Sequence, residues 1–237
     1  MLNKFVKVLC AVSFTFCTAF AGNVVIHSAG DSTMCNRKDN KRGSWVQVMS
    51  SCVKEGVTIR NRAVGGESTK SFIASKKWDK LIAEVKKGDF VIIQFGHNDQ
   101  KKKNPKRYTA ADGKFKDNLR KFITEVRAKE AFPIIATSIC RRSFGKDGKL
   151  TDRPNLREYA NAAIDVADEM KVPCVDLNTL TRDYLNEVGK EKSIELFYIF
   201  YDKKDNTHPT IKGAQIIARL FIQDVKKQNL EIAKLFK

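Results

Sequence analysis

The chain has 237 residues and a formal net charge of +17, from 44 Lys and Arg against 27 Asp and Glu. This length is sufficient to bury a sizeable core. The positive charge favours anionic partners, a class that includes nucleic acids, anionic cell-surface polymers and acidic polysaccharides. The sequence has neither zinc-finger spacing nor an aromatic RNA-binding motif, so we expect no nucleic-acid ligand.

Residues 1–21 are typical of an export signal. Lys4 and Lys7 precede the apolar stretch "LCAVSFTFCTAF", and "AFA" before Gly22 has the small-x-small form of a cleavage site. Removal of the signal would leave 216 residues (237 − 21) with a charge of +15, because two lysines are lost from +17. The sequence therefore predicts a secreted or periplasmic protein with one domain at 22–237 and no membrane segment after cleavage. A signal retained as a membrane anchor is the alternative.

Four cysteines follow the predicted signal: Cys35, Cys52, Cys140 and Cys174. An even count in an exported protein permits two disulfides, and four cysteines allow three pairings. Cys140 and Cys174 lie in or beside apolar runs, so reduced cysteines packed in the core are equally consistent with the sequence. The pattern assigns no pairing, and it gives no oligomeric state.

Apolar runs alternate with amphipathic stretches along the remaining chain. The runs that predict strands are 23–29, 57–61, 89–95, 132–139 and 172–177. The stretches that predict helices lie near 44–54, 70–87, 114–130, 155–170 and 178–189, with a last pair around 211–236. Several strands are nearly continuous in Val and Ile, as expected when both faces are covered. The alternation predicts a flavodoxin-like three-layer α/β/α sandwich with a five-stranded parallel sheet.

Polar clusters follow the first three predicted strands, and a fourth precedes the last helical segment. They are "GDST" (30–33), "NRAVGGEST" (61–69), "FGHND" (95–99) and "DNTHPT" (205–210). Ligands of such sheets bind beyond the carboxyl ends of the strands. We therefore expect the four clusters to meet at one edge of the sheet.

The residue types in these clusters suit acyl transfer. A serine hydroxyl such as that of Ser32 needs a base to take its proton, and His208 is the candidate. Asp205, three residues earlier, is placed to orient that histidine. The tetrahedral intermediate needs hydrogen-bond donors, for which the backbone N–H groups of Ser32 and Gly66 and the side-chain amide of Asn98 are the candidates.

At these residues the chain resembles the SGNH (GDSL-type) hydrolases. "AGDSTM", "AVGGES", "FGHNDQ" and "DNTHPTIKGA" are most similar to the rhamnogalacturonan acetylesterase branch. The resemblance implies that Ser32 is the nucleophile, His208 the base and Asp205 its partner, with Ser32, Gly66 and Asn98 as the oxyanion hole. It also implies a fold of the flavodoxin type and no metal or other cofactor. The expected partner is an acetylated polysaccharide, and the positive charge is compatible with the galacturonate of pectin.

Several residues have competing interpretations. Ser68 in "GESTK" resembles a nucleophile elbow but has Lys70 where a second glycine is required, so we expect it to cap a helix. We expect His97 to hold its loop or line the pocket, and His27 to pack within the first strand. Asp31 is expected to brace the turn around Ser32 through backbone N–H groups.

Aromatic and basic residues near these clusters have two interpretations each. Trp45 and "LFYIFY" (196–201) can stack on sugars or pack in the core, and packing is the more common role. Arg141, Arg142 and Arg153 can contact substrate carboxylates or be solvated loop residues. The run "KKKNPKR" (101–107) is expected to be a solvated loop.

Three alternatives to pectin deacetylation remain open at this level. The chain can act on another acylated glycan, such as xylan or peptidoglycan. It can be a non-catalytic binder of acidic polysaccharide, which explains the charge but not the Ser, His and Asp set. A metal-dependent phosphoesterase would use Asp31, His97, Asp99 and His208 as ligands, but such sites usually need denser clusters.

Overall fold

The computed structural model describes residues 23–151 and 156–237. Five parallel strands form one sheet in the order β2-β1-β3-β4-β5. The strands are β1 (Val24–Gly30), β2 (Val57–Asn61), β3 (Phe90–Gln94), β4 (Phe132–Ala136) and β5 (Cys174–Val175). The α-helices are α1 (Trp45–Met49), α2 (Thr69–Ala74), α3 (Lys77–Glu84), α4 (Lys116–Ala128), α5 (Leu156–Met170), α6 (Leu177–Val188) and α7 (Ile211–Lys227). Short helical segments are η1 (Ser50–Cys52), η2 (Ala111–Phe115), η3 (Ile194–Leu196), η4 (Tyr198–Phe200) and η5 (Glu231–Leu235).

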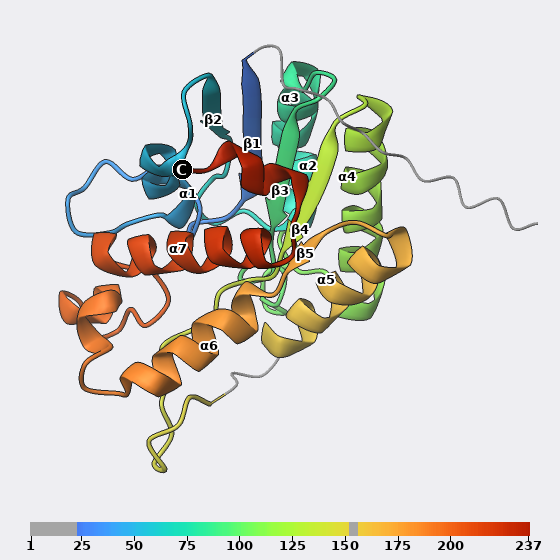
Figure 1. Cartoon of the computed structure of the whole chain (residues 1–237). Coiled ribbons are helices and arrows are strands. Elements are labelled where there is room, and N and C mark those ends of the chain that lie inside the picture. The colour runs from blue at the N-terminus through green and yellow to red at the C-terminus, as the bar shows by residue number, and fades with distance from the viewer. Residues whose placement is uncertain (1–22, 152–155) are drawn as a thin grey trace, which may run out of the picture.

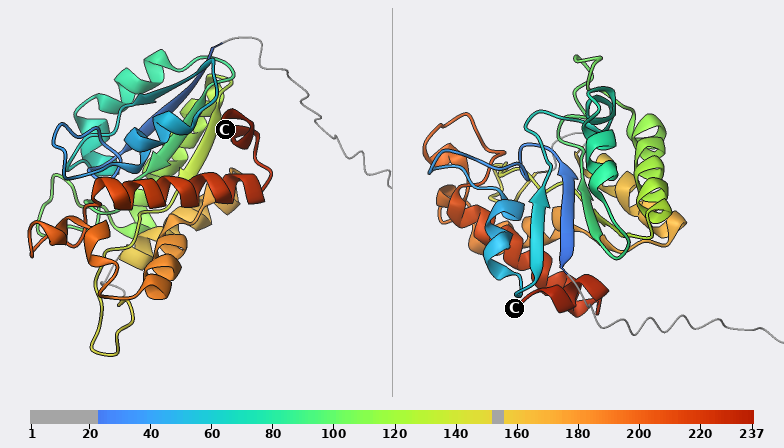
Figure 2. Two further views of the ribbon diagram at one scale, coloured as in Figure 1. Left: turned by 60° about the vertical axis from the view of Figure 1, so that its left-hand side comes forward. Right: turned by 90° about the horizontal axis from the view of Figure 1, so that it is seen from above.

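Helices cover both faces of the sheet, which confirms the predicted three-layer α/β fold (Figure 1). Successive strand residues point to opposite faces, so Ile92 and Ile134 join one buried cluster while Ile93 and Ile135 join the other. The first cluster packs against α1, α7 and η5, and the second packs against α2, α3, α4 and α5. Figure 2 shows α1 and α7 on one side of the sheet and α3 and α4 on the other.

The elements differ from the sequence prediction most in two places, and the strand expected over 132–139 ends at Ala136. The helix expected over 70–87 is two helices, α2 and α3, separated at Lys76, whose φ of 58° is left-handed. Phe72 and Trp78 would lie about 120° apart on one continuous helix, and the break allows both to be fully buried. The strand expected over 172–177 contains only Cys174–Val175, because Asp176 accepts a hydrogen bond from the Thr179 N–H and caps α6.

The sequence also led to expectations about an export signal, membrane segments and disulfides. Residues 1–21 lie outside the described residues, so the export signal stays a prediction. Among the helices of the described ranges, none combines the length and the apolar character that crossing a membrane requires. The cysteines at 35, 52, 140 and 174 are all free, so the described residues contain no disulfide. Burial raises the pKa of the Cys140 thiol to about 11.

Candidate active site

The turn after β1 presents Ser32 at the carboxyl edge of the sheet. Asp31 is fully buried, and its Oδ1 accepts hydrogen bonds from the backbone N–H and the hydroxyl of Thr33, both at 2.9 Å. Asp31 therefore braces the turn as the sequence predicts, and burial raises the pKa of its carboxyl. Arg37 donates from Nη2 to the Ser32 carbonyl oxygen at 2.6 Å. The sequence did not reveal this contact, because no motif marks Arg37.

The loop before α7 forms a turn around the Asp205 carboxylate. Its Oδ1 accepts from the backbone N–H groups of Thr207 and His208, each at 3.1 Å, and its Oδ2 lies 2.7 Å from His208 Nδ1. Partial burial opposes ionisation of Asp205. The hydrogen bonds from the side chain and backbone of His208 outweigh it and lower the pKa of Asp205 to about 2. An ionised carboxylate only accepts hydrogen bonds, so Nδ1 of His208 carries a proton.

The structure brings Ser32, His208 and Asp205 into one hydrogen-bonded line. His208 Nε2 lies 2.8 Å from Ser32 Oγ, although the two residues are 176 positions apart in the chain. With the proton of a neutral imidazole on Nδ1, Nε2 has a free lone pair and the Ser32 hydroxyl donates to it. The imidazole is thus placed to accept the serine proton.

Gly66 and Asn98 come from the loops after β2 and β3. Gly66 has a φ of +83°, a conformation that a side chain would strain. Asn98 donates from Nδ2 to the Glu67 carbonyl oxygen at 2.9 Å, which joins the two loops and leaves one N–H of its amide for another acceptor. A Cβ atom on Gly65 would lie 3.8 Å from Ser32 Cβ, so the Gly66 loop runs beside the serine. Within the described residues, the backbone N–H groups of Ser32 and Gly66 donate to no protein acceptor.

Asp99, rather than His97, holds the loop after β3. Its fully buried carboxylate accepts from the Thr69 N–H at 3.0 Å, the Gly96 N–H at 3.1 Å and the Thr109 hydroxyl at 2.9 Å. Burial raises the pKa of Asp99 to about 6. Among the described residues, neither ring nitrogen of His97 makes a hydrogen bond of good geometry. Burial lowers its pKa well below the ordinary value, and the Ile139 backbone offsets this only in part. The position of Asp99 directly after Asn98 was the only sequence signal for this role.

The other candidate residues have structural roles. Ser68 caps α2, because its hydroxyl accepts from the Ser71 N–H at 3.1 Å. His27 is buried in β1 with Nε2 3.2 Å from Asp89 Oδ2. Trp45 is fully buried and donates from Nε1 to Gln94 Oε1 at 2.9 Å, so it belongs to the core.

The basic and aromatic candidates divide between the site and the scaffold. Arg141 donates from Nε to the Thr207 hydroxyl at 3.1 Å, beside His208. Arg142 is buried and donates from Nε to the Ser193 hydroxyl at 3.0 Å, so it belongs to the scaffold. Arg153 lies outside the described residues. In the 196–201 segment, Leu196 and Phe197 are buried, whereas Phe200 and Tyr201 are exposed.

Among the described residues, those required for a metallophosphoesterase do not form a metal-binding group. The Asp99 carboxylate is surrounded by the hydroxyl and N–H donors described above, and Asp205 occupies Nδ1 of His208. Across the described ranges, no three His, Cys, Asp or Glu residues form a group suited to a metal ion.

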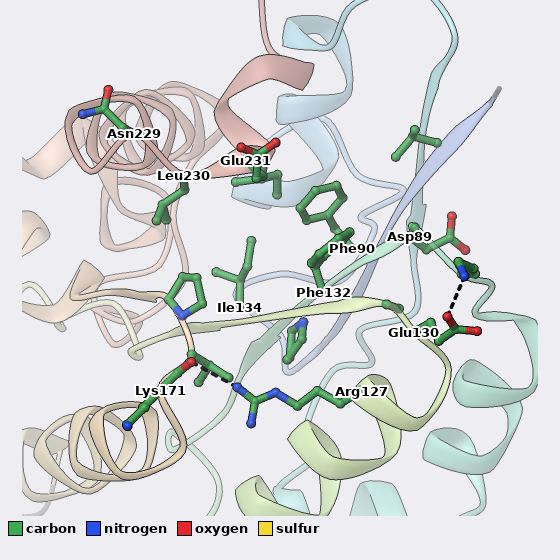
Figure 3. Close-up of a pocket in the computed structure, with 18 of the residues that line it drawn as sticks. Asp89, Phe90, Arg127, Glu130, Phe132, Ile134, Lys171, Asn229, Leu230 and Glu231 are labelled. Carbon is green, nitrogen blue, oxygen red and sulfur yellow. Dashed lines mark hydrogen bonds and ion pairs between the residues drawn. The ribbon is translucent and has the colours of Figure 1, made fainter. Parts of the chain in front are cut away.

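A cavity of about 960 Å³ lies at the opposite edge of the sheet. It is lined by the amino ends of β1, β3 and β4 and by residues before η5, among them Phe90, Phe132 and Leu230 (Figure 3). Arg127 closes one side by donating to the Lys171 carbonyl oxygen at 3.0 Å. None of the predicted site residues lines this cavity.

Comparisons with known proteins identify the family of the chain and several relatives. Residues 28–216 match the GDSL-like lipase/acylhydrolase family. The chain is 34% identical over 220 residues to the rhamnogalacturonan acetylesterase RhgT of Bacillus subtilis (strain 168), covering 88% of this chain and 92% of the relative. It is 24% identical over 223 residues to a rhamnogalacturonan acetylesterase of Emericella nidulans, covering 84% of each.

Two solved structures are also similar. The crystal structure of protein YXIM_BACsu from Bacillus subtilis superposes with a TM-score of 0.79 at 28% identity, covering 88% of this chain and 58% of that one. A catalytic mutant of the acetylxylan esterase Axe2 from Geobacillus stearothermophilus gives a TM-score of 0.62 at 19% identity, covering 86% and 94%, and shows a shared fold alone. The chain therefore belongs to the GDSL-like lipase/acylhydrolase family and is a carboxylic ester hydrolase, as its four sequence clusters predict.

Proposed function

We propose that the protein is a serine esterase that removes O-acetyl groups from an acidic plant cell-wall polysaccharide, with rhamnogalacturonan as the substrate. The observation that carries this proposal is the hydrogen-bonded line from Asp205 through His208 to Ser32. The names of the relatives, which are rhamnogalacturonan acetylesterases, support the substrate. The net charge of +17 suits a polymer that carries galacturonate.

In the proposed reaction, His208 Nε2 accepts the proton of Ser32 as Oγ attacks the acetyl carbonyl carbon. The carbonyl oxygen becomes negative and accepts hydrogen bonds from the Ser32 and Gly66 N–H groups and the Asn98 amide. His208 then protonates the departing sugar alkoxide, which leaves an acetyl group on Ser32. Water attacks this ester with His208 again as base, and acetate and free Ser32 are formed. Asp205 stays ionised and stabilises the imidazolium in both steps.

The test is acetate release from acetylated rhamnogalacturonan, acetylated xylan and O-acetylated peptidoglycan. We expect the fastest release from rhamnogalacturonan and a loss of at least about 10³-fold in Ser32→Ala. Faster release from xylan or peptidoglycan would show that the preferred substrate is another acylated glycan. Polymer binding without acetate release by the wild-type protein would identify a non-catalytic binder.

Ser68→Ala is the matched control, because it removes a second serine hydroxyl of the neighbouring loop. Loss of this helix cap costs about 1 kcal/mol of stability. We expect its rate to stay within about threefold of the wild-type rate. A loss as large as that of Ser32→Ala would instead make Ser68 a candidate nucleophile.

We also propose that the protein is exported and that residues 1–21 are removed. The lysines, the apolar stretch and the "AFA" sequence before Gly22 support this proposal. The mass of the protein recovered outside the cytoplasm tests it, because cleavage leaves a chain that begins at Gly22. A full-length chain in the membrane fraction would indicate a retained anchor.

A further inference from the structure

The basic run at 101–107 is anchored to the fold beside the proposed oxyanion hole. Lys70 donates from Nζ to the Pro105 carbonyl oxygen at 2.7 Å, which fastens the run to α2. The Arg107 N–H donates to the Asn104 carbonyl oxygen at 3.0 Å, and the Thr109 N–H donates to that of Asp99 at 3.1 Å. The run is a loop with five of its seven residues exposed, as expected, and these hydrogen bonds fix the position of its end.

The guanidinium of Arg107 lies against Gly66. A Cβ atom built on Gly66 would be 3.1 Å from Nη2 and 3.5 Å from Cζ of Arg107. The charged group is thus in contact with the backbone of a proposed oxyanion donor. Gly65 of the same loop lies beside Ser32, so the guanidinium is also near the proposed nucleophile.

Arg107 and Lys101 form no ion pair among residues 23–151 and 156–237, and within these ranges neither side chain donates a hydrogen bond to a protein acceptor. Desolvation lowers the pKa of Lys101, and the positive charges of Arg107 and Arg141 lower it further. The carboxylate of Asp31 acts in the opposite direction on this pKa. The Lys101 N–H donates to the Asn98 carbonyl oxygen at 3.2 Å, which places Lys101 directly after the loop of the proposed oxyanion donor. Arg141 is held on the other side by Thr207, next to His208.

We propose that Arg107 and Lys101 form a subsite for the carboxylate of a uronic acid residue next to the acetylated sugar, an inference that rests on the proposed polysaccharide substrate. The planar guanidinium can donate two parallel hydrogen bonds to one carboxylate, and the ammonium of Lys101 supplies a second positive charge. The uronate would relieve the repulsion among these cations. The subsite selects acidic chains through charge, whereas Ser32, Gly66 and Asn98 act on the acetyl group.

The experiment measures inhibition of p-nitrophenyl acetate hydrolysis by trigalacturonate, which carries carboxylates but no acetyl group. We compare the wild-type protein with Arg107→Gln, Lys101→Gln and the conservative Arg107→Lys. We expect the inhibition constant to rise about tenfold in Arg107→Gln and severalfold in Lys101→Gln, with partial recovery in Arg107→Lys. Trigalacturonate whose carboxyl groups have been reduced to alcohols should inhibit at least tenfold more weakly.

Lys103→Gln is the matched control, because Lys103 is an exposed lysine of the same run and makes no described contact. Its inhibition constant should stay within about twofold of the wild-type value. An equal inhibition constant in the wild-type protein and Arg107→Gln, equal inhibition by the reduced trisaccharide, or no inhibition of the wild-type protein would each overturn the subsite. Circular dichroism spectra identical to the wild-type spectrum exclude misfolding of the variants.

This assay separates the subsite from the proposed function, because it requires only hydrolysis of a small ester. If the wild-type protein hydrolyses p-nitrophenyl acetate but releases no acetate from rhamnogalacturonan, the proposed substrate is wrong whatever the inhibition shows. If acetate is released from rhamnogalacturonan and Arg107→Gln leaves the inhibition constant unchanged, only the subsite is wrong.

Discussion

Gly43 donates its backbone N–H to the carbonyl oxygen of Pro209 at 2.9 Å, so the loop that follows Ser32 is joined to the residue next to His208. A Cβ atom on Gly43 would lie 2.6 Å from both the Thr210 carbonyl oxygen and Ala214 Cβ. Glycine is therefore required for this close approach. The contact explains how two distant segments keep the distance between Ser32 Oγ and His208 Nε2 at 2.8 Å.

We expect Gly43→Ala to push the start of α7 away from the Ser32 loop. Overpacking of this kind costs about 1–3 kcal/mol of stability. A shift of about 1 Å between the reacting groups lowers the rate by about 10²-fold. Urea denaturation and hydrolysis of p-nitrophenyl acetate measure the two effects, and a variant with wild-type activity would contradict this role of the contact.

Asp205→Asn should lower kcat by about 10³- to 10⁴-fold, because an amide no longer holds the proton on Nδ1 of His208 or stabilises the imidazolium. The pKa of Asp205, about 2, also means that this carboxylate is ionised throughout the range above about pH 4. Asp205 should therefore contribute no acid-side ionisation to the profile of kcat/KM between pH 4 and 8. Because the Asp99 carboxyl has a pKa of about 6, the profile is also measured in Asp99→Asn, where a second acid-side ionisation would mean that Asp205 is not the permanently charged partner.

Asn98→Ala should lower kcat by about 10²- to 10³-fold with a small change in KM. The lost donor acts on the oxyanion, which is present only in the transition state and intermediate. The variant also loses the hydrogen bond to the Glu67 carbonyl oxygen, which can lower its stability. The midpoint of its urea denaturation is therefore measured together with kcat and KM. A change in KM with an unaltered kcat would place Asn98 in ground-state binding instead.

Asp99 should make stability depend on pH. Its folded pKa is raised from 3.8 to about 6, so the folded protein binds this proton more tightly than the unfolded chain does. The contribution of Asp99 to the free energy of unfolding is thus full below about pH 4 and is lost as the pH rises through about 6. Asp99→Asn lacks this titration and leaves the Gly96 N–H without its acceptor, at a cost of about 1–3 kcal/mol.

Urea denaturation of the wild-type protein and Asp99→Asn at pH 4, 5, 6 and 7 tests this expectation. The difference in free energy of unfolding between the two proteins should shrink as the pH rises from 4 to 7. Parallel pH dependences would show that Asp99 does not titrate in this range.

The order of strands and helices, and the four polar clusters at their ends, could be predicted from the sequence because they depend on local patterns. Runs of Val and Ile mark strands covered on both faces, and the 3.6-residue period marks helices such as α5. The same local logic predicted that Asp31 braces its own turn and that Ser68 caps α2. Each of these interactions spans only a few residues.

Only the tertiary structure decided which side chains meet. The break at Lys76 depends on burying both Phe72 and Trp78, and the short β5 depends on where α6 must begin. The role of Asp99 needed Thr69 and Thr109 from other elements, and the contact of Arg107 with Gly66 needed the anchoring of its loop by Lys70. These contacts are non-local, because they depend on the free energy of packing segments that are distant in the sequence. Short sequence patterns therefore cannot predict them.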